Sequence, residues 1–246
     1  MKKLVTAFAL CAAMSALAVD SQNIVGYNAI TLKPGFNMIG VQFQVVGGTA
    51  ASDIAVDDFI SKANLTAGAD YASGDNIYVF RNGGYLPMYY LWDDGAGGKS
   101  WWDVSDNPTD PLKNGDALWY YSRAVSDVTA VAAGQISSAN TDIGIKAGVF
   151  NMLSNPFPVS INLDNMANWA AISGAVAGAD YASGDNVYVF TAGGYLPMYY
   201  LWNDGAGGKS WWDVSDNPTA DLAPGQGFWY YSRAASDFNI TFTKPY

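Results

Sequence analysis

The stretch YASGDNIYVFRNGGYLPMYYLW, residues Tyr71–Trp92, decides the fold, because it returns almost unchanged as YASGDNVYVFTAGGYLPMYYLW at Tyr181–Trp202. In each copy two apolar runs flank a short turn. In the first copy the turn contains Asn82-Gly83, and both of these residues tolerate the positive φ angles of a tight hairpin. The stretch therefore predicts a β-hairpin that occurs twice.

The repeat is much longer than the hairpin. Residues Tyr71–Asp127 align with Tyr181–Asp237 at a constant offset of 110, and 45 of these 57 positions are identical. Seven of the twelve differences fall between Asp110 and Leu118, so we expect this segment to face different neighbours in the two copies. Two copies of this length predict tandem modules over residues 19–134 and 135–246, or one pseudo-twofold domain.

The predicted class is mainly β, with each module an antiparallel, sandwich-like sheet. Apolar and polar residues alternate over Ile39–Val45 and over Phe238–Phe242, which is the pattern of half-buried strands. Gly, Asn, Asp, Tyr and Trp are plentiful, and strong helix formers are scarce. We expect one short helix per copy, capped by Ser52 in the first and by Asn162 or Asp164 in the second.

The first 18 residues have the pattern of a secretory signal peptide. Lys2 and Lys3 precede the apolar run Leu4–Leu17, and a small-x-small cleavage site ends at Ala18. A transmembrane anchor is the less favoured alternative, since it needs ~20 apolar residues. We expect an exported chain that works outside the cell, at the cell surface or in the periplasm. The single cysteine, Cys11, would leave with the peptide.

Composition excludes much catalytic chemistry. The chain has no His, and all 22 of its acidic residues are Asp, so Ser-His-Asp and Cys-His machinery and His-ligated metals are ruled out. After cleavage, 10 basic and 22 acidic residues leave a net charge of −12, which disfavours nucleic acid and anionic lipid as partners. We expect no enzyme; a glycoside hydrolase that uses two Asp residues is the remaining catalytic alternative.

Asp-rich loops raise the question of calcium. The loops Asp93–Gly98 and Asp103–Asn107, with their second-copy equivalents, offer carboxylate oxygens but lack the EF-hand pattern. Asp, Asn and Gly also build turns for conformational reasons alone. We favour ordinary turns and expect no cofactor, with calcium as the alternative.

Neighbouring aromatic residues must point to opposite faces of a strand, so both faces of the predicted sheet are aromatic. Every second residue of a strand points to the same face, and one such set is Leu86, Met88, Tyr90 and Trp92. We assign this set to the core, together with Leu118, Tyr120 and Trp102. The opposite alternation combines rings with charged groups, which suits stacking on sugar faces, unless a second layer covers it. The predicted glycan-binding residues are Tyr89, Trp101, Asp103, Trp119, Tyr121, Arg123, Tyr199, Trp211, Asp213, Trp229, Tyr231 and Arg233.

Several motifs of the second copy occur together in a known repeat. They lie at Val149–Phe157 (VFNMLSNPF), Asp185–Phe190, Gly194-Tyr195 and Leu222–Trp229 (LAPGQGFW). In this combination the chain resembles a β-rich repeat of exported, uncharacterised bacterial proteins. The first copy departs from the pattern, with Gly40–Phe43 in place of Ser-Asn-Pro-Phe and Lys113–Asp116 in place of the Pro-Gly turn. The resemblance implies secretion and a β fold, and carries over no activity.

These features together predict a secreted or cell-surface protein that binds a glycan through exposed aromatic rings without catalysis. The alternative is a structural surface protein that assembles with copies of itself through sheet edges or aromatic faces.

Overall fold

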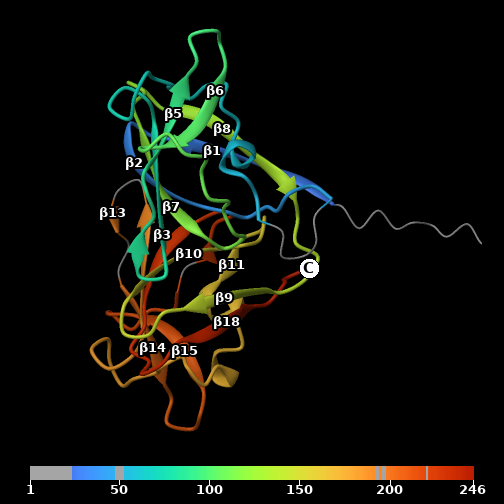
Figure 1. Ribbon diagram of the computed structural model, residues 1–246. Coiled ribbons are helices and arrows are strands. Elements are labelled where there is room, and N and C mark those ends of the chain that lie inside the picture. The colour runs from blue at the N-terminus through green and yellow to red at the C-terminus, as the bar shows by residue number, and fades with distance from the viewer. Residues whose placement is uncertain (1–23, 48–52, 192–193, 196–197, 220) are drawn as a thin grey trace, which may run out of the picture.

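The computed structural model describes residues 24–47, 53–191, 194–195, 198–219 and 221–246. The predicted signal peptide and Ser52 lie outside the described residues. The mainly β class is confirmed, and so is the duplication, because two similar sets of antiparallel strands follow one another along the chain (Figure 1). No helix among the described residues is long and apolar enough to cross a membrane.

The two modules share one succession of elements, and the second has two further short strands and a 3-10 helix. The first module is β1 (Val25–Leu32), β2 (Gly35–Gly40), α1 (Val56–Phe59), β3 (Asn76–Arg81), β4 (Gly84–Tyr85), β5 (Tyr89–Asp93), β6 (Lys99–Asp103), β7 (Ala117–Ser122) and β8 (Val128–Gln135). The second module is β9 (Thr141–Ile145), β10 (Phe150–Ser154), β11 (Ile161–Asn162), α2 (Leu163–Met166), the 3-10 helix η1 (Trp169–Ala171), β12 (Asn186–Thr191), β13 (Gly194–Tyr195), β14 (Tyr199–Asn203), β15 (Lys209–Asp213), β16 (Asp221–Leu222), β17 (Gly227–Tyr231) and β18 (Phe238–Phe242).

Each module contains one large sheet and one two-stranded ribbon, and the second also has the short pair β11–β16. A six-stranded sheet has the order β2-β7-β3-β5-β6, with β4 attached to β3, and its counterpart has the order β10-β17-β12-β14-β15, with β13 attached to β12. A two-stranded ribbon, β1–β8 or β9–β18, is the second layer. Figure 1 shows β5–β6 and β14–β15 at opposite ends of the molecule, while both ribbons lie on the same side.

The core of each module lies between the six-stranded sheet and its ribbon. In the first module, Ile77, Val79, Leu91 and Leu118 of the sheet are fully buried, and Ala132 is a buried ribbon residue in the same cluster. The matching cluster of the second module contains Val187, Val189, Leu201, Phe228 and Ile240. The face of each large sheet that points away from this core is called the outer face below.

Most of the local predictions hold where turns and caps decide the structure. Asn82 and Gly83 have φ angles of 56° and 82°, as the hairpin requires. One short α-helix occurs in each copy, and the Asn162 side chain caps the second by accepting from the backbone N–H of Asp164 at 3.0 Å. The prediction of Ser52 as the cap of the first helix is wrong, because that helix begins after Ala55, which has no side-chain oxygen to cap it. The predicted strand over Phe238–Phe242 is β18.

The predicted strand over Ile39–Val45 is wrong beyond Gly40, where β2 ends. Val41, Gln42 and Phe43 do not alternate between buried and exposed; all three are completely buried. The reason is that the second module covers this segment, with Gly225 next to the Gln42 side chain.

The two modules meet through contacts that repeat with their roles exchanged. The backbone N–H of Gly40 donates to the Gly225 carbonyl at 2.7 Å, and that of Ser154 donates to the Gly115 carbonyl at 2.8 Å. Gly40 corresponds to Ser154, and Gly225 corresponds to Gly115. Such reciprocity is the signature of a twofold, isologous interface, here formed within one chain.

Aromatic rings repeat this exchange on the outer faces. Phe80 packs edge-to-face on Trp229 at 5.0 Å between ring centroids, and Trp119 packs on Phe190 at 4.8 Å in the same way. Met38, Ala117 and Met152 are buried between these rings, and residues of both modules make up this cluster. We call these contacts and the two backbone hydrogen bonds the module junction.

The junction also explains where the two copies differ. Gly115, Ala117 and their equivalents Gly225 and Gly227 all contact the other module, and they belong to the segment in which most substitutions fall. The expectation that this segment faces different neighbours holds for residue type only: Gly115 meets Ser154, whereas Gly225 meets Gly40 at the equivalent position. Leu118 and its equivalent Phe228 are the exception, because this difference lies in the module cores.

We predict that Gly40→Ala destabilises the protein by about 1–3 kcal/mol, the usual cost of overpacking. A Cβ at Gly40 would overlap the Ser154 side chain and lie 3.0 Å from the Gly225 carbonyl oxygen. Urea unfolding of the full chain measures the effect. Gly144→Ala is the matched control, because its Cβ would meet only the Asn239 side-chain oxygen at 3.6 Å. Equal unfolding free energies for the two variants would contradict the role given to the junction.

Candidate binding face

The outer face of each large sheet is lined by aromatic side chains. On β7, Leu118 and Tyr120 point into the core, whereas Trp119 and Tyr121 lie on the outer face and are half-buried. The predicted alternation of this strand, and of β17 with Trp229 and Tyr231, is confirmed. The strand registers place these rings on the outer face of the first module: Phe36, Tyr78, Tyr90, Trp92, Phe80, Trp102, Trp119 and Tyr121.

The prediction that Tyr89, Trp101, Tyr199 and Trp211 belong to the same exposed face is wrong. These four side chains are 1%, 2%, 5% and 0% exposed and lie in the module cores. Tyr90, Trp92 and Trp102, assigned to the core from sequence, instead lie on the outer face.

The cause is a break in the strand. Residues 86–88 separate β4 from β5, since Pro87 cannot donate to the sheet, and the alternation does not continue across the gap. Leu91 of β5 points inward, and its partner across the sheet is Trp101, which must point inward as well. Val104, which would share the alternation of Trp102, lies beyond the end of β6 and is exposed.

The charged residues predicted for the site hold turns together. The Asp103 carboxylate is mostly buried and accepts from the backbone N–H groups of Ser105 at 2.7 Å and Asn107 at 2.8 Å. Asp213 repeats these bonds with Ser215 and Asn217. The structure therefore places both carboxylates inside their own turns and not on the outer face.

Arg123 and Arg233 reach the rim of the outer face. The Arg123 guanidinium group lies 5.1 Å from the ring centroid of Tyr121 and donates to the backbone carbonyls of Gly74 and Tyr71. Arg233 does the same with Tyr231, Gly184 and Tyr181. These contacts fix the loop before β3 or β12 and stiffen the neighbouring Tyr ring.

Two aromatic hollows flank the module junction, and each combines residues of both modules. The larger, of 560 Å³, is lined by Phe36, Tyr78, Tyr85, Trp119 and Phe190. The smaller, of 410 Å³, is lined by Phe80, Phe150, Tyr188, Tyr195 and Trp229. The two sets are equivalent in the duplication, so the hollows are two versions of one site.

Sequence reasoning missed most of these rings. Tyr78 and Phe80 alternate with Ile77 and Val79 on β3, and this alternation was a signal for an aromatic outer face. No local signal places Phe190 in a hollow of the first module, because that contact depends on the junction.

The hollows present apolar rings with polar tips. Tyr85 is 55% exposed and Tyr195 is 53% exposed, while the Trp rings beneath them are half-buried. Burial raises the pKa of the Tyr78, Tyr85 and Tyr188 hydroxyls, which therefore remain protonated as hydrogen-bond donors and acceptors at neutral pH. No charged residue is among those that line either hollow.

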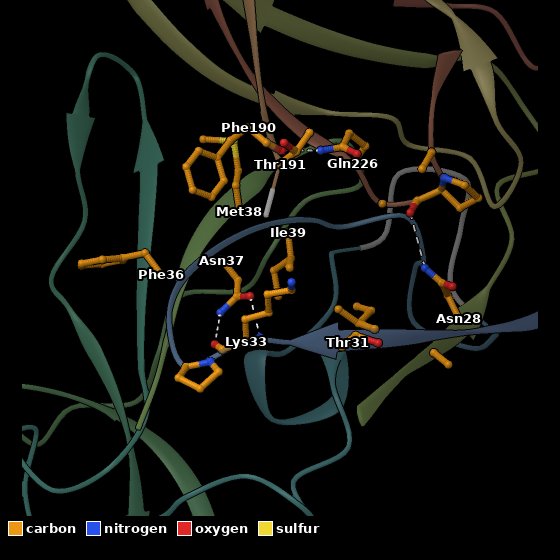
Figure 2. A pocket seen from close by; sticks show the side chains of 16 residues that line it. Asn28, Thr31, Lys33, Phe36, Asn37, Met38, Ile39, Phe190, Thr191 and Gln226 are labelled. Atoms are coloured by element: carbon orange, nitrogen blue, oxygen red, sulfur yellow. Dashed lines mark hydrogen bonds between the residues drawn. The ribbon is translucent and has the colours of Figure 1, made fainter. Parts of the chain in front are cut away.

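A third cleft, of 520 Å³, lies beside the larger hollow, with which it shares Phe36 and Phe190 (Figure 2). One wall comes from β1, β2 and the turn between them, including Thr31, Lys33 and Asn37, and the other includes Thr191 and Gln226. The Asn37 amide is already bonded to the Lys33 and Gly35 carbonyls, and the Gln226 amide donates to the Phe190 carbonyl. The polar groups of this cleft thus stabilise the chain around it.

The sequence difference between the copies explains this cleft. In the first module, Arg81 and Asp116 stand where the second has Thr191 and Gln226. The Arg81 guanidinium binds the Asp116 carboxylate at 2.5 Å. Burial raises the pKa of Asp116, and the Arg81 charge opposes that shift. Replacing this large ion pair by Thr and Gln leaves more open space beside the second copy.

The most deeply buried carboxylates have structural partners. Asp75 accepts from the Tyr120 hydroxyl at 2.6 Å and from the backbone N–H groups of Arg123 at 2.7 Å and Thr66 at 2.9 Å. Asp185 has the equivalent partners Tyr230, Arg233 and Val176. Because both carboxylates are completely buried and satisfied, they hold the sheet to the loops around it.

The Asp-rich loops also use their oxygens internally. Asp94 accepts from the backbone N–H groups of Ala96 at 2.8 Å and Gly98 at 2.7 Å, and Asp204 repeats this pattern. Over the part of the chain that the structure describes, no three acidic, His or Cys side chains are gathered closely enough to hold a metal ion.

The turn carboxylates predict a loss of stability in acid. Hydrogen bonds from Asn107 and Asn217 lower the pKa of Asp103 and Asp213 below their ordinary value of 3.8. A carboxyl group whose pKa is lower in the folded state stabilises the fold above its unfolded pKa. That stabilisation is lost as the pH falls from about 4 through the lower folded values.

We therefore expect the double variant Asp103→Asn with Asp213→Asn to be less stable than the parent at neutral pH. Its stability should also fall less steeply between about pH 4 and pH 2. Urea unfolding at a series of pH values measures both effects. The control pair Asp53→Asn with Asp127→Asn removes two exposed carboxylates that bond to no described residue. A control with the same flattened acid profile would contradict the assignment.

Comparison with known proteins gives no match: no protein family, no curated protein and no solved structure is similar to this chain. The function is therefore argued from the geometry of the outer faces.

Proposed function

We propose that this protein is an exported, non-catalytic binding protein whose two aromatic hollows hold a neutral or lightly charged glycan. The observation that carries the proposal is the pair of equivalent hollows, each lined by five aromatic rings. Aromatic faces stack on the C–H surfaces of sugar rings, and Tyr hydroxyl groups bond to sugar hydroxyls. Both hollows fall in the range of about 300–1,000 Å³ that small-ligand sites occupy.

The arrangement of the two hollows favours a polymer over a single sugar. Phe80 and Trp119, which line different hollows, pack against the same buried cluster at the module junction, so the hollows are neighbours. A repeating chain long enough to engage both would gain an effective affinity of about 10² over one site. The acidic surface disfavours a strongly anionic polysaccharide.

The absence of catalysis is argued from the available groups. The chain has no His or Glu. The Asp75 and Asp185 carboxylates are completely buried under Tyr hydroxyl and backbone N–H donors, away from the hollows. The lining residues contribute no acid and no base with which to cleave a glycosidic bond.

A glycan array with the full chain tests the proposal. Tyr85→Ala with Tyr195→Ala removes the most exposed Tyr ring from each hollow, and we expect binding to weaken by about two- to tenfold per site. The matched control is Tyr71→Ala with Tyr181→Ala. These residues are each 54% exposed, similar to Tyr85 and Tyr195, but do not line a hollow.

Two outcomes would overturn the proposal. An array without hits, together with concentration-dependent oligomers in light scattering, would favour the self-assembling structural protein. Exposed apolar rings such as Phe36 and Phe150 would then be its contact surface. Hydrolysis of a polysaccharide that is lost on an Asp→Asn substitution would establish an enzyme instead.

A further inference from the structure

A second pair of aromatic sites lies at the ends of the molecule, far along the sheets from the module junction. At one end β14 and β15 form the tip of the second sheet, and at the other β5 and β6 form the tip of the first (Figure 1). On the outer face of the second tip, Tyr200, Trp202, Trp212 and Asp216 line a hollow of 250 Å³. None of these residues lines the central hollows.

The tip hollow has the form of a small cage. Tyr200 is 7% exposed and makes its floor, and it lies directly opposite Trp212 in the β14–β15 register. Trp202 and Trp212 are half-buried walls whose rings stand at 76° to each other with centroids 6.2 Å apart. The indole N–H of Trp212 is held by the Ser210 hydroxyl at 2.8 Å. This wall therefore offers its π surface and has no free donor.

A carboxylate completes the cage. Asp216 is exposed at the rim, and its negative charge raises the pKa of the Tyr200 hydroxyl. In the first copy the Tyr90 hydroxyl donates to the Asp106 carboxylate at 3.1 Å, and the Trp92 and Trp102 rings are again 6.2 Å apart at 80°. Both ends of the molecule thus carry the same three rings and one carboxylate.

The electrostatic environment of each cage is negative. Burial is the largest cause of the raised pKa of Tyr200. The negative charges of Asp216, Asp180 and Asp213 raise this pKa further. At the other tip Asp106, Asp70 and Asp103 act on Tyr90 in the same direction. The Arg233 charge lowers the pKa of Asp180, and its guanidinium group is held by the Tyr231 ring and by the Gly184 and Tyr181 carbonyls. The net charge of the whole chain, −10, has the same sign.

We propose that each tip cage binds a methylated ammonium group, held against the faces of the three rings and beside the carboxylate. The negative π faces of Trp and Tyr attract a cation, and this attraction is strongest where water is excluded. A quaternary ammonium ion has no N–H donors, so it needs no ring of acceptors. It also has a weakly hydrated methyl surface that matches aromatic walls.

Other cations fit the cage less well. A primary ammonium group has three donors, whereas the cage offers one carboxylate and one Tyr hydroxyl as acceptors. Calcium takes six or more oxygen ligands, and two of the nearby carboxylates, Asp180 and Asp213, are bonded to the backbone of their own loops. A neutral sugar could stack on the rings but would make no use of the negative environment.

The experiment titrates the full chain with choline, using Trp fluorescence and calorimetry. Its control ligand is 3,3-dimethylbutan-1-ol, in which carbon replaces the charged nitrogen. We expect choline to bind at two equivalent sites with affinity in the millimolar range, and the neutral compound to bind at least about fivefold more weakly. Binding should weaken as the salt concentration rises.

Variants separate the parts of the cage. Asp106→Asn with Asp216→Asn keeps an acceptor for each Tyr hydroxyl while removing the charge, and should weaken choline binding by about five- to tenfold. Trp102→Leu with Trp212→Leu should abolish it. The control pair Asp53→Asn with Asp127→Asn removes the same number of charges from exposed positions elsewhere and should leave the affinity within about twofold.

Three results would overturn the inference: no choline binding by the parent chain, equal binding of the neutral compound, or equal affinities for the cage and control Asn variants. The comparison of the two ligands needs no substitution, so it stands even if a Trp variant fails to fold. The cage variants leave the central hollows intact, so glycan binding and choline binding succeed or fail separately.

Discussion

Two reciprocal backbone hydrogen bonds, from Gly40 to Gly225 and from Ser154 to Gly115, hold the two modules against each other at 2.7 Å and 2.8 Å. These bonds require two backbone segments of the chain to approach closely, and the absence of a side chain at Gly40 permits this approach. Once the backbones meet, Phe80 and Phe190 cross into the opposite module and pack on Trp229 and Trp119. Without this contact each outer face would be a flat row of rings, and neither central hollow would exist.

The duplication gives the molecule its symmetry, and the junction is where the symmetry is broken. The module cores contain matching residues, such as Tyr120 on Asp75 and Tyr230 on Asp185. At the junction, the Arg81–Asp116 ion pair of one copy is replaced by Thr191 and Gln226 in the other. Substitution there changes the space beside the hollows without disturbing either core, because the cores lie on the far side of each sheet.

Aromatic residues have two separate roles in this fold. Inward-pointing rings such as Trp101 and Trp211 are core residues, where they contribute buried apolar area. Outward-pointing rings such as Trp102 and Trp212 form hollows in which part of each ring still faces solvent. The two kinds are neighbours in the sequence, and strand geometry alone separates them. If the alternation of a strand is assigned in reverse, its core rings are therefore taken for binding-site rings and its binding-site rings for core.

The sequence by itself determined the duplication, the β class and the Asn82-Gly83 hairpin, and it narrowed the cap of the second helix to Asn162 or Asp164, because turns and caps depend on residues close together in the chain. It also oriented β7 and β17 correctly, since these strands are uninterrupted. It failed for Tyr89 and Trp101, because the break at Pro87 hides the register and only pairing with the neighbouring strand sets it. The tertiary structure alone decided the hollows and cages, because their walls come from segments that meet only when sheets pair and modules dock.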